Sequence, residues 1–231
     1  MKTLGIIGGI GPESTVDYYR LLISTYQERM QDGSYPSVVI NSIDVKRMVD
    51  WFTANELSQV VEYLLAELSR LAGAGADFAL LAANTPHAVF GEVSRRSPLP
   101  LLSIVEATCA EAKALGLGRL GLLGTRFTMS GRFYPEVFER EGLALVAPGE
   151  QEQAFIHERY MNELLKGVFL DETRERLLAI AERLKEREGV EGLILGGTEL
   201  PLILRGETAA GLPLLDTTRI HVQAAVERML S

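Results

Sequence analysis

The chain has 231 residues, which is long enough for one large domain or two small ones. Hydrophobic residues make up 47% of it and charged residues 23%, so an extended disordered protein is excluded. The formal net charge of −8 disfavours a nucleic-acid partner, because phosphate backbones repel an acidic surface.

Cysteine content and apolar run lengths bear on where the protein works. Cys109 is the single cysteine, so no disulfide can form within the chain. A chain without disulfides is consistent with a reducing compartment. The N-terminal apolar stretch is broken by glycines and is too short for a signal sequence. No stretch reaches the roughly 20 apolar residues of a membrane span. We therefore expect a soluble, cytoplasmic protein that makes no contact with membranes.

Short apolar runs alternate along the chain with longer amphipathic stretches, which is typical of β-α units around a parallel sheet. The continuously apolar runs predict strands that are covered on both faces. We expect strands at residues 4–8, 37–43, 78–82, 101–104, 120–124, 143–147, 193–196 and 212–215. We expect helices at residues 14–30, 56–71, 106–114, 131–141, 150–166, 172–187 and 218–230.

Two segments of the first half are echoed in the second half. Residues 4–8 match residues 120–124 at an offset of 116, and residues 75–85 parallel residues 189–199 at an offset of 114. Such similar offsets favour a duplicated half, although glycine-bounded apolar strands also look alike in unrelated proteins. Duplication predicts an α/β fold of two similar parallel-sheet domains, related by a pseudo-twofold axis with a cleft between them. The expected domains are residues 1–98, completed by the C-terminal helix 216–231, and residues 99–215.

A glycine-rich turn at residues 8–11 follows the first strand and opens a helix. Glycines there allow positive φ angles and let a ligand approach the backbone amides. The rival interpretation is a dinucleotide-binding fingerprint, but Ser14 replaces its third glycine and Pro12 removes an amide donor. Asp44 also lies further along the chain than the usual acidic ribose ligand, so nicotinamide binding is disfavoured.

Three further strand-to-helix turns carry polar side chains. Residues 83–87 and 197–201 are counterparts in the two echoed halves, and residues 123–129 form the third turn. Each turn alone is an ordinary helix start, with Asn84 or Thr85 as the capping residue of the first. Two such turns in related halves would instead direct amide donors at one small anion, such as a carboxylate.

Other catalytic patterns are weak in this sequence. The three histidines, His87, His157 and His221, show no metal-ligand spacing and no second thiolate accompanies them, so we expect no zinc site. A Gly-x-Ser-x-Gly elbow and a Walker lysine loop are also missing. Lone histidines more often cap or cover helices than catalyse.

Five blocks, which keep their order and span nearly the whole chain, resemble the aspartate/glutamate racemase family. They are residues 1–15, 82–87, 122–134, 193–204 and 214–226. The resemblance implies two similar α/β domains around a cleft, homodimers, and amino-acid racemase (isomerase) activity without pyridoxal phosphate, metal or other cofactor. Two cysteines of such a racemase face the substrate's α-carbon from opposite sides, and one removes the proton while the other returns one.

The resemblance also implies where those cysteines would stand. The first precedes Asn-Thr and the second precedes Thr-Glu, and these places hold Ala83 and Gly197 here. Neither side chain can exchange a proton, and Cys109 is expected to be a packing residue in a helix. The substrate-binding residues implied by the resemblance are Ile10, Asn84, Thr85, Thr125, Lys166, Thr198 and Glu199. Lys166 would pair with an acidic side chain of the substrate, or else it is a helix C-terminal charge before Gly167.

We therefore expect a racemase-like protein that binds a small amino acid or carboxylate in its cleft. Catalysis without the thiols would need substitutes, for which His87, Glu199 and His221 are available, with a water relaying protons; this would make a related isomerase, lyase or hydrolase. The alternative is a non-catalytic sensor or regulator, and chemistry at Lys166 is a third option. Restoring the cysteines with Ala83→Cys and Gly197→Cys is predicted to create racemase activity.

Overall fold

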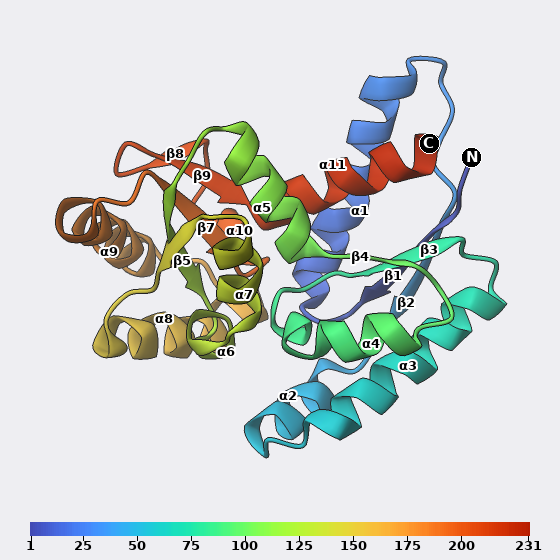
Figure 1. Ribbon diagram of the computed structural model, residues 1–231, viewed down its shortest axis with the longest axis horizontal. Coiled ribbons are helices and arrows are strands. Elements are labelled where there is room, and N and C mark those ends of the chain that lie inside the picture. Colours follow the sequence, from blue (N-terminus) through green and yellow to red (C-terminus); the bar gives the residue numbers. More distant parts are fainter. The chain divides into compact units, whose positions relative to one another are not determined.

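A computed structural model describes residues 1–231 as an α/β protein with two sheets, as the sequence predicts (Figure 1). The chain forms two compact units, one made of Met1–Ile104 with His221–Ser231 and the other of Val105–Ile220. The domain boundaries expected from the sequence, residues 1–98 with 216–231 and residues 99–215, stay a prediction. None of the helices is both long enough and apolar enough to span a membrane.

The first unit is built on a four-stranded parallel sheet in the order β2-β1-β3-β4. Its strands are β1 (Leu4–Gly8), β2 (Val38–Ser42), β3 (Phe78–Leu81) and β4 (Leu101–Leu102). Its helices are α1 (Pro12–Met30), α2 (Val45–Thr53), α3 (Leu57–Gly73), the 3-10 helix η1 (Thr85–Val89) and α4 (Phe90–Arg96). Because Ile7 pairs with Leu81, the turns after β1 and β3 begin side by side at one edge of the sheet.

The last helix, α11 (Thr217–Leu230), completes the core of the first unit. Tyr18, Leu22 and Tyr26 line one face of α1 at a helical spacing and are fully buried. They pack in one cluster with apolar residues of β1, β3 and α11; the α11 members are Val222, Ala225, Val226 and Met229. Figure 1 shows α11 in red beside α1 in blue, near the chain's N-terminus.

The second unit is built on a five-stranded sheet in the order β6-β5-β7-β9-β8. Its strands are β5 (Arg119–Gly124), β6 (Ala144–Val146), β7 (Gly192–Gly196), β8 (Thr208–Ala209) and β9 (Leu212–Asp216). Its helical elements are α5 (Ile104–Ala114), α6 (Arg126–Ser130), α7 (Phe133–Arg140), α8 (Glu150–Asn162), the 3-10 helix η2 (Leu164–Lys166), α9 (Asp171–Glu188) and α10 (Leu200–Ile203). The order β6-β5-β7-β9 repeats the order β2-β1-β3-β4, which supports the duplication inferred from the sequence.

All eight expected strands are present, but several elements depart from the sequence prediction. The short helices η1, α4, α6 and α10 were not among the expected helices. β8 was not expected and pairs antiparallel with β9, because Ala210 and Gly211 take positive φ angles and reverse the chain. The helix expected over residues 150–166 breaks at Glu163, whose φ of −119° ends α8 before the short η2. α2 was also missed, and it begins at Asp44, whose side chain accepts a hydrogen bond from the Lys46 amide.

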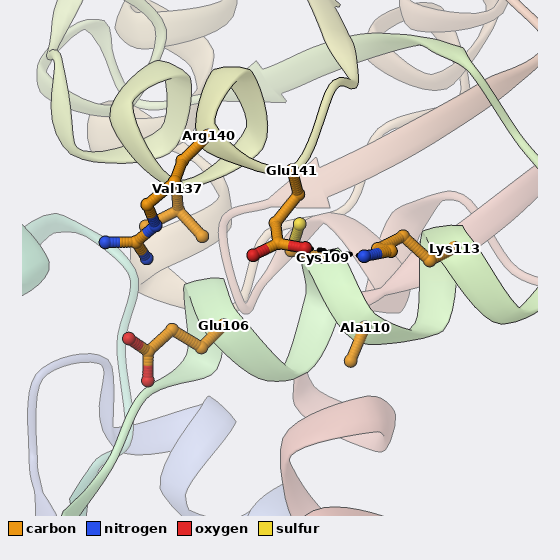
Figure 2. Close-up of a pocket in the computed structure, with 7 residues that line it drawn as sticks. All are labelled: Glu106, Cys109, Ala110, Lys113, Val137, Arg140 and Glu141. Atoms are coloured by element: carbon orange, nitrogen blue, oxygen red, sulfur yellow. Dashed lines mark hydrogen bonds and ion pairs between the residues drawn. The ribbon is translucent and has the colours of Figure 1, made fainter.

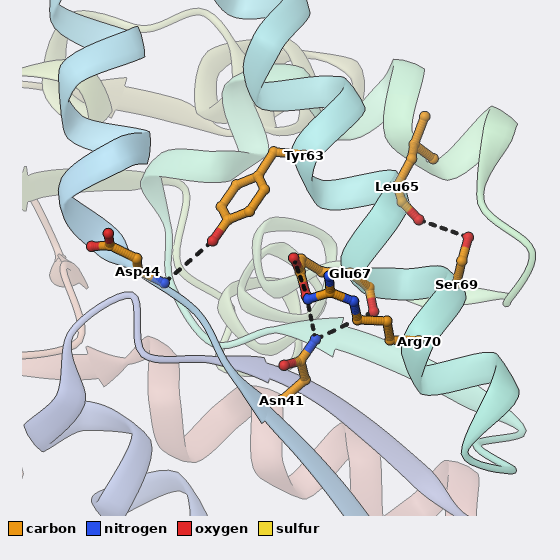
Figure 3. A network of polar contacts seen from close by, with 7 residues as sticks. All are labelled: Asn41, Asp44, Tyr63, Leu65, Glu67, Ser69 and Arg70. Carbon is orange, nitrogen blue, oxygen red and sulfur yellow. Dashed lines mark hydrogen bonds and ion pairs between the residues drawn. The ribbon is translucent and has the colours of Figure 1, made fainter.

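Helix α3 carries a buried carboxylate, Glu67, that faces β2 (Figure 3). Asn41 Nδ2 of β2 donates to Glu67 Oε2 at 2.7 Å, and Arg70 Nη1 donates to the same oxygen at 2.8 Å. The Arg70 side chain is 71% exposed, so the ion pair is screened by solvent. The Asn41 bond is therefore the contact that matters for stability, since its loss takes the buried acceptor away from a half-buried amide.

Replacing this carboxylate gives a first testable prediction. Glu67→Ala is expected to lower the free energy of unfolding by about 1–3 kcal/mol, because Asn41 loses its buried acceptor. The matched control is Ser69→Ala on the same helix, where an exposed hydroxyl donates only to the Leu65 carbonyl. Urea denaturation measures both variants, and equal small losses would contradict a structural role for Glu67.

Candidate functional site

The turn after β1 is held by its own side chains. Gly9 and Gly11 take positive φ angles of 78° and 114°, as the glycine pattern predicts. A Cβ on Gly9 would stand 2.4 Å from the Ile43 carbonyl oxygen, so only glycine fits there. The Gly9 amide donates to Thr15 Oγ1 at 2.8 Å, which means that this donor is used within the turn. Ile10 is buried, at 8% exposure.

The turn after β3 carries Ala83, Asn84 and Thr85, of which the first two are buried. Asn84 makes no side-chain capping bond to η1, so the expected capping role is wrong for Asn84. The reason is conformational: Asn84 has helical angles of −81° and −49°, whereas a capping side chain needs an extended backbone to reach the first amides. Its carbonyl oxygen instead accepts from the His87 amide at 2.9 Å.

His87 lies in η1 with both ring nitrogens engaged. The Ile104 amide donates to Nε2 at 3.2 Å, so the ring proton is on Nδ1, which donates to the Ala83 carbonyl at 3.1 Å. The ring also stacks on Phe90, with centroids 4.7 Å apart. Burial lowers the pKa of His87 to about 4, and the bond to the Ala83 carbonyl offsets only part of this.

His221 is fully buried in α11 and is held in the same manner. Nε2 faces the Leu102 carbonyl at 3.1 Å and must donate to it, so Nδ1 accepts from the Tyr18 hydroxyl at 3.0 Å. Burial, together with a smaller contribution from the neighbouring His87, lowers the pKa of His221 to about 3. Either ring must therefore give up a structural hydrogen bond before it can take a proton from a substrate.

In the second unit, the turns after β5 and β7 also begin side by side. Gly124 pairs with Gly196 across the sheet, and the next residues are Thr125 and Gly197. Thr125 is the N-cap of α6: its side chain accepts from the Thr128 amide at 3.3 Å, as an ordinary N-cap does. A Cβ on Gly124 would lie 2.6 Å from the Gly196 carbonyl oxygen, so glycine is needed where the two strands end.

The turn after β7 holds a buried acidic group. Glu199 is 1% exposed, and its Oε2 accepts hydrogen bonds from the Tyr160 hydroxyl and, at 3.1 Å, from Thr198 Oγ1. Tyr160 comes from α8 and is 4% exposed. Burial raises the pKa of Tyr160 well above its ordinary value, and the neighbouring Glu199 carboxylate raises it further. The phenol therefore stays protonated and donates to Glu199.

Tyr160 fills the space beside Gly197. A Cβ added to Gly197 would stand 2.5 Å from Tyr160 Cε2 and 2.9 Å from the Tyr160 hydroxyl oxygen. Sequence reasoning missed Tyr160, because it is 39 residues from Glu199 and sits in a helical run with nothing to distinguish it. The only available signal was the glycine itself, since a residue without a side chain in a buried turn implies a neighbour that needs the room.

Lys166 ends η2 and is exposed, and Gly167 follows it with a left-handed φ of 71°. This is the helix C-terminal arrangement expected as the alternative to a binding role. The geometry at Lys166 is therefore that of an ordinary helix end, and the pairing of Lys166 with a substrate carboxylate stays a prediction.

Cys109 lies on α5 in a surface pocket of about 440 Å³ (Figure 2). The residues that line this pocket are Glu106, Cys109, Ala110, Lys113, Val137, Arg140 and Glu141, and none belongs to the strand-end turns. Lys113 Nζ and Glu141 Oε2 form an ion pair of 2.5 Å across it. Burial raises the pKa of the Cys109 thiol, with a further increase from Glu141, so the reactive thiolate is disfavoured.

Comparison with known proteins assigns the family. The model for Asp/Glu/Hydantoin racemase matches residues 7–225. The chain is 23% identical to the broad specificity amino-acid racemase RacX of Bacillus subtilis, over 99% of this chain and 98% of that protein. A crystal structure of a proposed Asp/Glu racemase from Yersinia pestis is 30% identical, with a TM-score of 0.90 and both chains fully covered. An aspartate racemase homologue from Pyrococcus horikoshii OT3 is 34% identical, with a TM-score of 0.85 and again full coverage of both. The chain therefore belongs to the Asp/Glu/hydantoin racemase family.

Proposed function

We propose that the protein binds a small amino acid or a related carboxylate at the carboxyl ends of its central strands. The observation that carries the proposal is that each unit ends its two central strands in adjacent turns, and that polar side chains lie in all of these turns except the one after β1. The second unit places Thr125 beside the turn that contains Thr198 and Glu199. The first unit likewise places Ile10 in the turn next to Asn84 and Thr85. In open α/β sheets, ligands bind at this edge.

Hydroxyls and an amide are suited to a carboxylate, which accepts several hydrogen bonds at once. The racemases that resemble this chain have substrates of that class in their names. We further propose that binding needs no cofactor, takes place in the cleft predicted from the sequence and occurs in a cytoplasmic homodimer, as the family resemblance implies.

We also propose that the protein does not racemise by exchange between two thiols. Such a mechanism needs two cysteines, and the chain has one. Cys109 is 2% exposed, lies on α5 and has a pKa that burial raises, so it does not supply a ready thiolate. The places that the resemblance gives to the family's cysteines, Ala83 and Gly197, have no group that can carry a proton.

Binding is tested directly by isothermal titration with aspartate, glutamate, alanine and serine, each as both enantiomers. Lys166→Gln is expected to weaken binding of the two acidic amino acids about tenfold or more, because a charge-assisted hydrogen bond is lost. Binding of alanine and serine should change less than threefold. The matched control, Lys46→Gln, removes an exposed lysine of the first unit and should leave all affinities unchanged.

Two outcomes would count against these proposals. Equal losses for acidic and neutral ligands in Lys166→Gln would remove the role given to Lys166. Absence of binding for every amino acid and for simple dicarboxylates, by titration and by thermal shift, would remove the proposed function itself.

A further inference from the structure

We propose that the Tyr160 hydroxyl, with Glu199 as its proton acceptor, is the group that exchanges a proton with the α-carbon of the bound amino acid. This inference rests on the proposed function, because it requires an amino acid at the turn after β7. It adds one catalytic residue, Tyr160, and one residue that acts through it, Glu199. It also adds a consequence: proton exchange takes place on one face of the α-carbon, without inversion.

The position of Tyr160 is the first argument. Its hydroxyl oxygen lies 2.9 Å from the place that a Cβ on Gly197 would occupy. A cysteine sulfur stands one bond beyond Cβ, so the phenol oxygen falls in the region that a thiol at position 197 would fill. The chain thus lacks a side chain at Gly197 but has a hydroxyl brought to the same place from α8.

The hydrogen bonds of the phenol are the second argument. Its O–H donates to Glu199 Oε2, and its oxygen accepts from the Glu199 amide at 3.5 Å. A phenol oxygen has two lone pairs, and the second one faces the Thr198 hydroxyl. Thr198 has Glu199 Oε2 as its other acceptor, so this lone pair can take a substrate proton once the Thr198 hydroxyl turns fully to Glu199. Glu199 Oε2 is fixed by Thr198 Oγ1 as well, which keeps the acceptor in place behind the phenol.

The proton balance of the step is complete within the chain and the substrate. The α-carbon–hydrogen bond breaks as a bond from that proton to the Tyr160 oxygen forms. At the same time the original phenol proton passes to Glu199, which changes from carboxylate to carboxylic acid. The electron pair of the broken bond stays on the substrate as an enolate-like carbanion. When the proton held on Tyr160 has exchanged with solvent before the transfers reverse, the reversal returns a solvent-derived proton to the same face.

Charge and burial agree with this arrangement. The raised pKa of Tyr160 keeps the phenol protonated, so it can lose its proton to Glu199 only as it gains another. Asn84 and Thr125, which the family resemblance places at the substrate, are 3% and 7% exposed. The low exposure of Tyr160 and Glu199 therefore matches the rest of the candidate site.

Inversion would need a second proton carrier on the opposite face of the α-carbon. The family resemblance gives that place to Ala83, whose methyl group cannot exchange a proton. His87 is bonded to the Ala83 carbonyl and to the Ile104 amide, so its nitrogens are occupied. Exchange should therefore be limited to the enantiomer that presents its α-proton to Tyr160, and the product should keep its configuration.

The test is α-proton exchange in deuterated water, followed by NMR and by chiral chromatography, with amino acids that bind in the titration. The wild-type protein should exchange the α-proton of one enantiomer without forming the other. Tyr160→Phe should reduce the exchange rate about 10²–10⁴-fold, with affinity changed less than threefold. Glu199→Gln should also reduce it, because the amide cannot accept the phenol proton.

The matched control is Tyr134→Phe, a fully buried tyrosine of α7 in the same unit, which also bonds to a neighbouring side chain, Thr108. It should leave the exchange rate unchanged. Binding without exchange, or exchange that survives Tyr160→Phe, would overturn this inference and leave the proposed function intact. Formation of the opposite enantiomer as fast as exchange would overturn the one-face claim. Failure to bind at all would instead contradict the proposed function.

Discussion

Lowering the pH from 7 to 4 is expected to unfold most of the protein. His87 and His221 have pKa values lowered by burial to about 4 and about 3, whereas an unfolded histidine titrates near 6.5. Between these values the unfolded chain binds more protons than the folded one. The free energy of unfolding is therefore at its full value above pH 6.5. As the pH falls below 6.5, it decreases by about 1.4 kcal/mol per pH unit for each histidine. By pH 4, where the folded-state His87 is itself half protonated, the two together remove about 6 kcal/mol, which is comparable to the whole stability of a typical domain.

Urea denaturation at several pH values between 7 and 4 measures this loss. His221→Gln keeps a donor for the Leu102 carbonyl and an acceptor for Tyr18, and it should remove about half of the pH dependence. His157→Gln is the control, because His157 is only partly buried and its pKa is lowered less. NMR gives a second measurement that needs no variant. Imidazole signals of His87 or His221 that titrate near pH 6.5 in the folded protein would contradict the prediction.

The second large effect is expected for Gly197→Cys. Its Cβ would meet the Tyr160 ring at 2.5 Å, and the ring cannot move without losing its bond to Glu199. We expect the free energy of unfolding to fall by about 3 kcal/mol, at the upper end of ordinary overpacking. The control is Gly91→Cys, because a Cβ at Gly91 has no atom within 4 Å.

A double-mutant cycle isolates the contact. Tyr160→Ala alone should also destabilise, since it leaves a cavity. The combination Gly197→Cys with Tyr160→Ala should be less destabilised than the sum of the two, by about 1–3 kcal/mol. Strict additivity would mean that Tyr160 does not fill the space beside Gly197.

The same contact changes how a racemase would be rebuilt. The sequence alone suggests that Ala83→Cys and Gly197→Cys are enough. The geometry adds a third substitution, because the sulfur of Cys at position 197 and the Tyr160 hydroxyl would claim the same space. Racemisation is therefore expected only in the triple variant that also carries Tyr160→Ala.

The sequence predicted the sheets well because buried parallel strands are continuously apolar, and that pattern is local. β8 escaped because a two-residue strand carries no pattern at all. The candidate site was predicted only as far as its local turns. The contact of Tyr160 with Glu199 joins residues 39 positions apart, and no periodicity encodes such a pair.

The histidines illustrate the same limit. Their positions near the turns suggested proton carriers, but what a ring nitrogen can do depends on its partners. The partner of His221 Nε2 is the Leu102 carbonyl, 119 residues away along the chain. Only the folded structure shows that both rings are held by such bonds.

The packing of α11 against α1 has a consequence for biosynthesis on the ribosome. Residues 1–104 emerge first, yet the cluster that contains Tyr18, Leu22 and Tyr26 is incomplete until residues 222–229 have been made. The unit formed by residues 105–220 does not depend on residues 222–229, so it can fold earlier. The nascent N-terminal segment therefore waits with an exposed aromatic face, and a chaperone that holds it during translation should raise the yield of native protein.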